Sequence, residues 1–152
     1  MNRIAFPLVC VLMATSTASS AQFAAQRLAA TRTLTCTFTT LAIGTWINGE
    51  AQAQVKPAKL SIKFEEIDSD EGTARIASDV GKYDIIVRLT EDTLHFVQMF
   101  RSGPLYSTTV FSKENAQGKF KAVHSRHEYT DVILPGFTSR PEQYYGECQA
   151  GS

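Results

Sequence analysis

The amino-acid sequence predicts an all-β protein: a small antiparallel meander, either an up-and-down barrel of calycin-like type or a β-sandwich, preceded by a signal peptide. Three observations support this fold class. Apolar and polar residues alternate with a period of two in several short segments, which is typical of half-buried strands. Turn residues separate these segments at intervals of about 8–12 residues, as in sandwiches and barrels. Beyond the signal peptide, no segment shows the amphipathic helical period of about 3.6 residues.

The first residues have the order of a secretory signal peptide. A positive charge at Arg3 is followed by an apolar run from Ile4 to Ala14, and then by small and hydroxyl residues up to Ala21. The run is shorter than the about 20 apolar residues that cross a bilayer as a helix. We therefore predict a signal peptide over residues 1–21, cleavage before Gln22, a periplasmic or secreted mature protein, and no stable membrane span after cleavage.

Cleavage changes the cysteine count and the net charge. Of the three cysteines in the chain it removes Cys10 and leaves Cys36 and Cys148, and an oxidising compartment favours a disulfide between these two. It also removes Arg3, so 14 of the 15 basic residues face 15 acidic ones and the formal charge becomes −1. Nucleic-acid binding rewards a concentrated basic patch, so we expect no nucleic-acid partner.

A single β-domain is expected over residues 33–149, after a flexible lead-in at residues 22–32 that is rich in Ala and Gln. In the first strand Leu34, Cys36 and Phe38 alternate with threonines, so Cys36 faces inward. A bridge from this strand to Cys148 in the last one suits a closed sheet, which favours the barrel over the sandwich. The expected strands are Thr33–Thr39, Leu60–Glu65, Thr73–Ser78, Tyr83–Leu89, Thr93–Phe100, Leu105–Phe111, Phe120–Tyr129 and Tyr144–Cys148.

Short turns justify the antiparallel order of these strands. Gly, Pro, Asp and Ser favour turns because they tolerate or fix the backbone angles that turns need. Such residues connect consecutive strands at Asp68–Gly72, Gly81–Lys82, Thr90–Asp92 and Ser102–Pro104, and a longer polar loop occupies Ser112–Gly118.

The densest polar cluster is the segment from His124 to Glu128. If the alternation from Phe120 continues, His124, Arg126 and Glu128 face inward and His127 faces outward. Inward charged groups require partners, so this reading predicts a paired network or the mouth of a binding cavity, with Arg126 bound to Glu128 or to neighbouring strands. The alternative is a strand that leaves the core after Val123, with these residues in solvent.

The same geometry argues against a metal ion at this cluster, and we expect no cofactor. Residues three apart in a strand point to opposite faces, so His124 and His127 cannot bind one ion. A nucleophile motif of the G-x-S-x-G type is absent, and the disulfide leaves no free cysteine. We therefore predict no catalytic residue, and keep a hydrolytic enzyme using His124, His127 and Glu128 only as the weakest alternative.

The function that the sequence favours is an exported, non-catalytic binding or interaction module for an unknown small molecule or protein. The alternative is a structural accessory domain of the cell envelope that binds no ligand. A cavity of several hundred cubic ångströms inside the barrel would favour a small-molecule ligand. A filled interior would favour the accessory domain.

Two resemblances to known families complete the reading. Gly44-Thr45-Trp46 is similar to the G-x-W motif of lipocalins, which implies a tryptophan that seals one end of a barrel. The segments 122–127 (A-V-H-S-R-H) and 143–148 (Q-Y-Y-G-E-C) resemble motifs of small exported bacterial proteins of unknown function, as do Leu34–Thr39 and Ser107–Val110. This second resemblance implies export from a bacterium and a paired Cys36 and Cys148, and it implies no activity.

Overall fold

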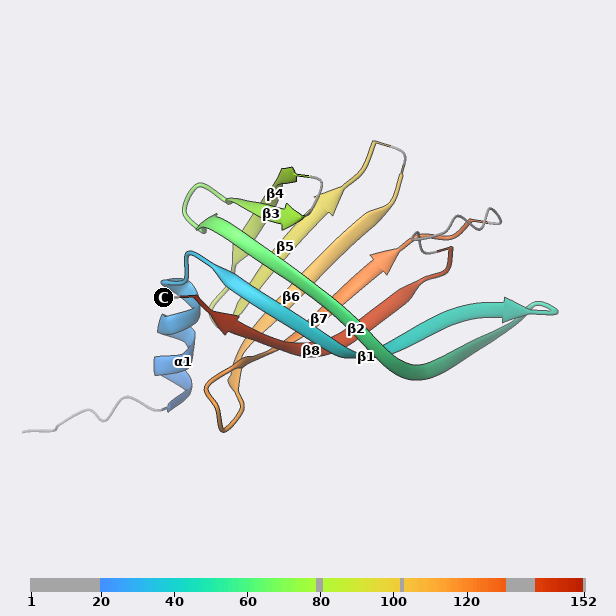
Figure 1. Cartoon of the computed structure of the whole chain (residues 1–152), viewed down its shortest axis with the longest axis horizontal. Coiled ribbons are helices and arrows are strands. Elements are labelled where there is room, and N and C mark those ends of the chain that lie inside the picture. Colours follow the sequence, from blue (N-terminus) through green and yellow to red (C-terminus); the bar gives the residue numbers. More distant parts are fainter. Residues whose placement is uncertain (1–19, 79–80, 102, 131–138, 152) are drawn as a thin grey trace, which may run out of the picture.

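A computed structural model of the chain describes residues 20–78, 81–101, 103–130 and 139–151. Within them, one helix precedes eight antiparallel strands that follow chain order and close into a barrel, because the first strand pairs with the last (Figure 1). The predicted all-β meander is confirmed, in its barrel form. The elements are α1 (Ser20–Ala29), β1 (Leu34–Ile47), β2 (Glu50–Asp68), β3 (Thr73–Ser78), β4 (Gly81–Leu89), β5 (Thr93–Met99), β6 (Leu105–Glu114), β7 (Phe120–His127) and β8 (Glu142–Ala150).

The helix α1 corrects the expectation of a flexible lead-in at residues 22–32. Ala24 and Leu28 lie four residues apart on one face of the helix, and both are buried against the barrel. Arg27 fixes the helix to the β6–β7 loop through a hydrogen bond to the Gly118 carbonyl at 2.7 Å and an ion pair with Glu114 at 3.1 Å. Alanine is the strongest helix former, so this Ala-rich segment forms a helix with only Ala24 and Leu28 buried. Two buried residues are too few to give the sequence a clear helical period.

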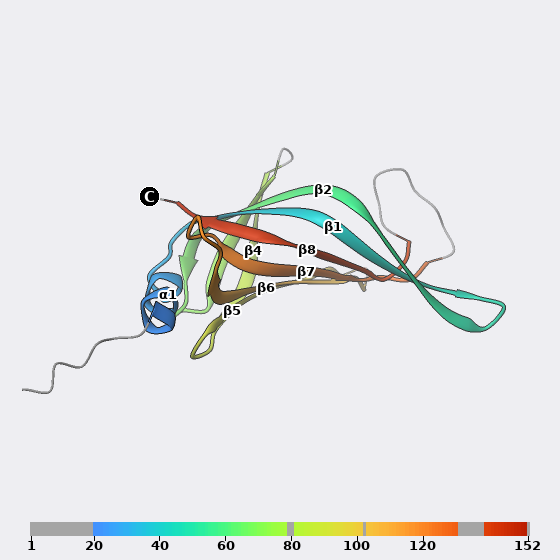
Figure 2. The ribbon, with the colours of Figure 1, turned by 90° about the horizontal axis from the view of Figure 1, so that it is seen from below.

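The strands β1 and β2 are much longer than predicted and project from the barrel as a hairpin arm (Figures 1 and 2). β8 pairs with β1 only as far as Ile43↔Glu142, and beyond that point the described residues of β1 and β2 pair with each other. The turn at the tip has Asn48 and Gly49 at φ of 53° and 85°, the conformation of a tight two-residue hairpin. An Asn-Gly pair is a strong hairpin signal, and it is the feature that could have revealed the arm.

The arm also overturns the lipocalin-like reading of Gly44-Thr45-Trp46. Trp46 lies on the arm with 53% of its surface exposed and does not seal an end of the barrel. Its ring meets the edge of Tyr129 with the centroids 5.6 Å apart.

The barrel interior is filled with apolar side chains, as the alternation predicts. Leu34, Cys36 and Phe38 are fully buried, whereas the threonines between them are exposed. Phe64 and Phe96 stack across the interior with ring centroids 3.9 Å apart. The other large, fully buried side chains are Leu28, Ile67, Val87, Leu94, Val110, Phe120 and Cys148.

The pairing between β4 and β5 is short. It runs from Leu89↔Leu94 to Ile86↔Val97 and does not continue to the other ends of the two strands. Farther along, β4 stays paired with β3, and β5 with β6. The two strand pairs therefore diverge, as Figure 1 shows, and we call this gap the β4–β5 opening.

Candidate functional site

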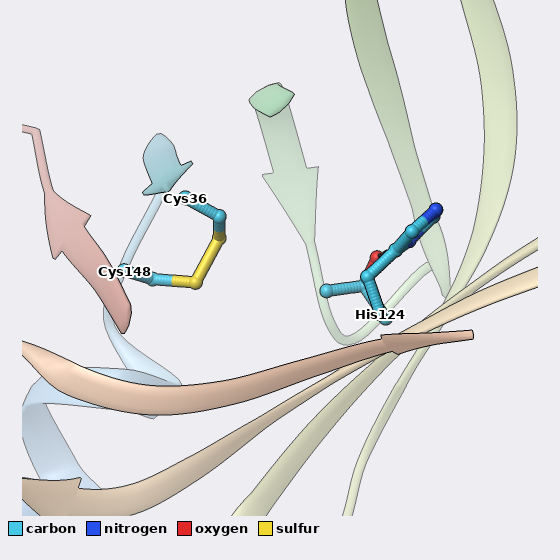
Figure 3. The surroundings of a disulfide bond; sticks show 4 residues. Cys36, His124 and Cys148 are labelled. Atoms are coloured by element: carbon cyan, nitrogen blue, oxygen red, sulfur yellow. Dashed lines mark hydrogen bonds between the residues drawn. A yellow bond between two sulfur atoms is a disulfide. The ribbon is translucent and has the colours of Figure 1, made fainter. Parts of the chain in front are cut away.

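The disulfide joins the two ends of the barrel wall. Cys36 on β1 and Cys148 on β8 lie opposite each other in the strand register, with their Cα atoms 3.9 Å apart and their sulfurs bonded. Figure 3 shows this bond and His124 within the same barrel. The predicted pairing is thus present in the structure.

A glycine next to the disulfide allows the two strands to approach closely. Gly146 lies opposite Phe38, where the β1–β8 register shifts. A Cβ atom at this position would lie 2.1 Å from the Thr37 carbonyl oxygen and 2.6 Å from the Phe38 Cα atom, closer than real contacts allow. The glycine in the Q-Y-Y-G-E-C segment is therefore required by backbone packing.

His124 faces the barrel interior and is only 4% exposed, so the solvated reading of this segment is wrong for His124. Its Nδ1 lies 2.8 Å from the Thr108 hydroxyl, and its Nε2 accepts a hydrogen bond from Arg126 Nε at 3.3 Å. Because an arginine N–H only donates, the neutral ring carries its proton on Nδ1 and donates it to Thr108. Burial, with a smaller contribution from the Arg126 charge, lowers the pKa of His124 to about 3.

Arg126 lies between two tyrosine rings, next to His124. Its guanidinium carbon is 5.3 Å from the centroid of Tyr106 and 5.2 Å from that of Tyr144. It pairs with Glu142 on β8, whose Oε2 lies 3.7 Å from Arg126 Nη1. Of the two pairings expected for Arg126, the one that forms is therefore with a neighbouring strand.

The two tyrosines connect Arg126 to two carboxylates. The Tyr106 hydroxyl donates to Glu128 at 3.0 Å, and the Tyr144 hydroxyl donates to Glu142 at 2.7 Å. Burial, together with its bond to Glu142, raises the pKa of Tyr144 to about 12. The pKa of Tyr106 is raised by burial and by its bond to Glu128. His124, Arg126 and Glu128 thus belong to one paired network.

The histidines and the carboxylate proposed for acid–base chemistry do not converge. His127 is exposed on the outer face of β7, whereas His124 lies inside. Glu128 is bound to Tyr106 rather than to either histidine. In the part of the chain that the structure describes, no group of three His, Cys, Asp or Glu side chains is arranged to hold a metal ion.

The space inside the barrel beside His124 is small. The interior pocket that His124 lines together with Thr108, Tyr106 and Gln98 has a volume of about 10 Å³. This is room for about one water molecule and not for a small organic ligand.

Two larger spaces among the described residues lie on the outside of the barrel. A groove of about 900 Å³ crosses the outer faces of β6, β7, β8 and β1, and we call it the lysine groove. Lys119 in it is paired with Glu147 at 2.7 Å, whereas Lys113 and Lys121 make no ion pair with any described residue. Its lining is Thr37, Thr39, Phe111, Lys113, Asn115, Lys119, Lys121, Ala122, Val123, Tyr145, Gly146 and Glu147.

Sequence reasoning missed the lysine groove. Lys113 and Lys121 follow the outward parity of their strands, but a sequence does not reveal which outward residues on different strands become neighbours. The pairing of β6, β7 and β8 brings them together, and the register of β6 against β7 shifts between Val110 and Glu114, next to Lys113.

No helix among the described residues is long and apolar enough to cross a membrane. Comparison of the chain with known protein families, with curated proteins and with solved structures finds no match. The resemblance to small exported bacterial proteins therefore stays a prediction.

Proposed function

We propose that this protein is an exported interaction module that binds an acidic segment of a partner protein in the lysine groove. The main observation is a groove of about 900 Å³ lined by three lysines and one glutamate. Glu147 is paired with Lys119, and Lys113 and Lys121 make no ion pair with a described residue. A volume of this size is typical of binding clefts, and lysines without a counter-charge attract carboxylates.

The other side chains of the groove favour a protein over a purely charged ligand. Tyr145 is 43% exposed, and Phe111 and Val123 line the same space. Aromatic residues are enriched in protein interfaces because they bury a large area with few rotatable bonds. We therefore expect a partner segment that places Asp or Glu beside apolar residues.

Two features support action outside the cytoplasm. The first residues have the pattern of a signal peptide, and the domain is closed by the disulfide between Cys36 and Cys148. Disulfides persist in oxidising compartments such as the periplasm and the extracellular medium.

Peptide selection tests the proposal. A phage-displayed library of random peptides is selected on the mature protein, and the enriched peptides are synthesised and titrated at low and high salt. We expect enriched sequences to combine acidic and apolar residues and to bind more weakly as salt screens the lysines. The double variant Lys113→Glu, Lys121→Glu should weaken binding at least about tenfold.

The matched control is Lys56→Glu with Lys59→Glu, which reverses two exposed charges on β2, outside the groove. This control should bind like the wild type. Peptides without acidic residues, or equal affinity for both double variants, would contradict the proposal.

The second candidate is a structural accessory domain of the envelope. The apolar packing of the described interior favours it, because the pocket beside His124 has no room for a ligand. Failure to enrich any peptide for the groove, in a protein that stays folded, would favour this candidate over the first.

A further inference from the structure

We infer that the β4–β5 opening receives one extended, largely apolar strand of a partner protein, which completes the barrel wall there by pairing with both free edges. The opening lies on a different part of the wall from the lysine groove, so this inference does not rest on the function proposed above.

The alternation of the backbone shows which N–H and C=O groups of β4 and β5 point toward the opening. Val87 N–H donates to the Gly72 carbonyl, so the backbone groups of Val87 and Ile85 point toward β3 and those of Ile86 and Asp84 point toward β5. On the other side, Phe100 N–H donates to the Pro104 carbonyl, which directs the backbone groups of Met99 away from β6 and toward β4. Both strands thus turn hydrogen-bonding edges toward the opening.

The pairing of β4 with β5 ends just before the position at which these edges would meet. Thr90 N–H donates to the Thr93 carbonyl, and in an antiparallel pair every second pair of residues exchanges hydrogen bonds. The hydrogen-bonded pairs are therefore Thr90 with Thr93, Arg88 with His95, and Ile86 with Val97. Asp84 and Met99 would be the next such pair, and they are not paired. A strand edge with unused N–H and C=O groups is a template for another strand.

Most side chains at the opening are apolar and the β4 charges beside it are balanced, whereas Arg101 lines the groove without an ion pair to a described residue. A groove of about 800 Å³ lies there, lined by Tyr83, Ile86, Met99 and Phe100 among others. Met99 is 73% exposed, an unusual position for a large apolar side chain. Asp84 is bound to Arg75 at 2.9 Å and Lys82 to Glu65 at 2.6 Å, so the β4 charges beside the opening are matched within the chain.

These observations select an extended, largely apolar polypeptide strand as the occupant. Backbone edges on both walls require N–H and C=O groups in register, which an extended peptide supplies and a small apolar molecule does not. The charges of β4 are paired within the chain, so Arg101 is the one described cation of the lining without an ion pair, and it favours at most one carboxylate beside the apolar residues of the occupant.

The interior restricts the side chains of that strand. Ile85, Val97 and Gln98 line both the outer groove and the interior pocket of about 10 Å³. Side chains alternate between the two faces of a strand, so every second residue of the occupant would point into this small space. We therefore expect small residues such as Gly, Ala or Ser at the inward positions and large apolar residues at the outward ones, beside Ile86 and Met99.

Met99 offers a matched pair of variants for the test. Met99→Pro removes the N–H that faces the opening, whereas Met99→Ala removes the same exposed side chain and keeps the N–H. Random peptides are selected on the mature protein, synthesised and titrated against the wild type and both variants, with circular dichroism to verify folding. We expect peptides that alternate small and large apolar residues, and at least about tenfold weaker binding only for Met99→Pro.

Hydrogen exchange with a bound peptide locates the site. The Asp84 and Met99 amides should gain protection. The double variant Lys113→Glu, Lys121→Glu should bind this peptide with the affinity of the wild type. The inference is overturned if no alternating peptide is enriched, if Met99→Pro binds as well as Met99→Ala, or if protection appears elsewhere. A dimer in sedimentation that Met99→Pro abolishes would also overturn it, because the occupant would then be a second copy.

Discussion

The barrel wall is held very differently at two places, the seam between the first and last strands and the β4–β5 opening. At the seam, β1 and β8 pair continuously from Leu34↔Ala150 to Ile43↔Glu142 apart from one register shift, and the disulfide crosses between them. At the opening, pairing stops at Ile86↔Val97 although β4 and β5 are joined by a short turn. The seam joins strands distant in sequence, yet it is the better closed of the two.

This difference separates a part of the wall that is closed by strand pairing and a covalent bond from a part that exposes unpaired strand edges. The seam carries a covalent bond and a glycine, Gly146, that only the close approach of the two strands explains. The opening exposes strand edges and apolar side chains, features that proteins usually cover. We interpret the seam as the structural closure and the opening as a surface for a partner.

Removing the disulfide is expected to have the largest effect on stability. Cys36 and Cys148 are separated by 112 positions, and a bridge that closes a loop of about this length restricts the unfolded chain by about 4–5 kcal/mol. The variant Cys36→Ala, Cys148→Ala should lose about this much in chemical denaturation, measured beside the wild type. A loss below about 1 kcal/mol would mean that strand pairing alone holds the seam.

Truncating Arg126 should come next. Arg126 and Glu142 retain only 21% and 13% of their side-chain exposure, and Arg126→Ala would leave Glu142 in the network without its cation. Breaking such a buried pair costs about 3–5 kcal/mol, whereas exposed sites change stability by less than about 0.5 kcal/mol. Urea unfolding of Arg126→Ala beside His127→Ala, the exposed control on the same strand, separates the two. Equal small losses would show that the network is not desolvated.

Acid should lower the free energy of unfolding through His124, which is buried as a neutral ring. Its pKa is about 3 in the folded protein and near the ordinary value of 6.5 when unfolded, so below pH 6.5 the unfolded state binds the proton first. The contribution is complete above pH 6.5 and decreases as the pH falls toward 3, by about 3 kcal/mol at pH 4.

The variant His124→Gln tests this pH dependence, with His127→Gln as the control that keeps every carboxylate. Denaturation between pH 4 and 7 should show a flatter curve for His124→Gln only. Tyr106 and Tyr144, whose rings lie beside His124, have raised pKa values and do not change charge in this range. Parallel curves for both variants would argue that His124 is protonated in the folded state.

Adding a methyl group to Gly146 at the seam should have a smaller effect on stability. Gly146→Ala forces a Cβ atom against the β1 backbone and should cost about 1–3 kcal/mol. Gly44→Ala is the control, because the nearest atom to its Cβ would lie 3.9 Å away. Thermal unfolding of the two variants compares them, and an unchanged melting temperature for Gly146→Ala would contradict the close approach.

The sequence predicts those features that depend on one strand alone. Alternation places His124, Arg126 and Cys36 inside because burial on one face imposes a period of two. The same logic cannot find Tyr106, Tyr144 and Glu142 as partners of Arg126, since they lie on other strands and their contacts depend on the register. The hairpin arm is missed because both its faces are exposed, and α1 because two contacts with the barrel order it.

Native-state hydrogen exchange tests the contrast between seam and opening most directly. We expect the Asp84 and Met99 amides to exchange at least about 100-fold faster than those of Ile86 and Val97, an opening free energy lower by about 2.7 kcal/mol. The β1 amides from Leu34 to Phe38, paired on both sides, should be among the slowest. Protection of Asp84 and Met99 equal to that of Ile86 and Val97 would show that β4 and β5 are closed along their length, and would contradict the account.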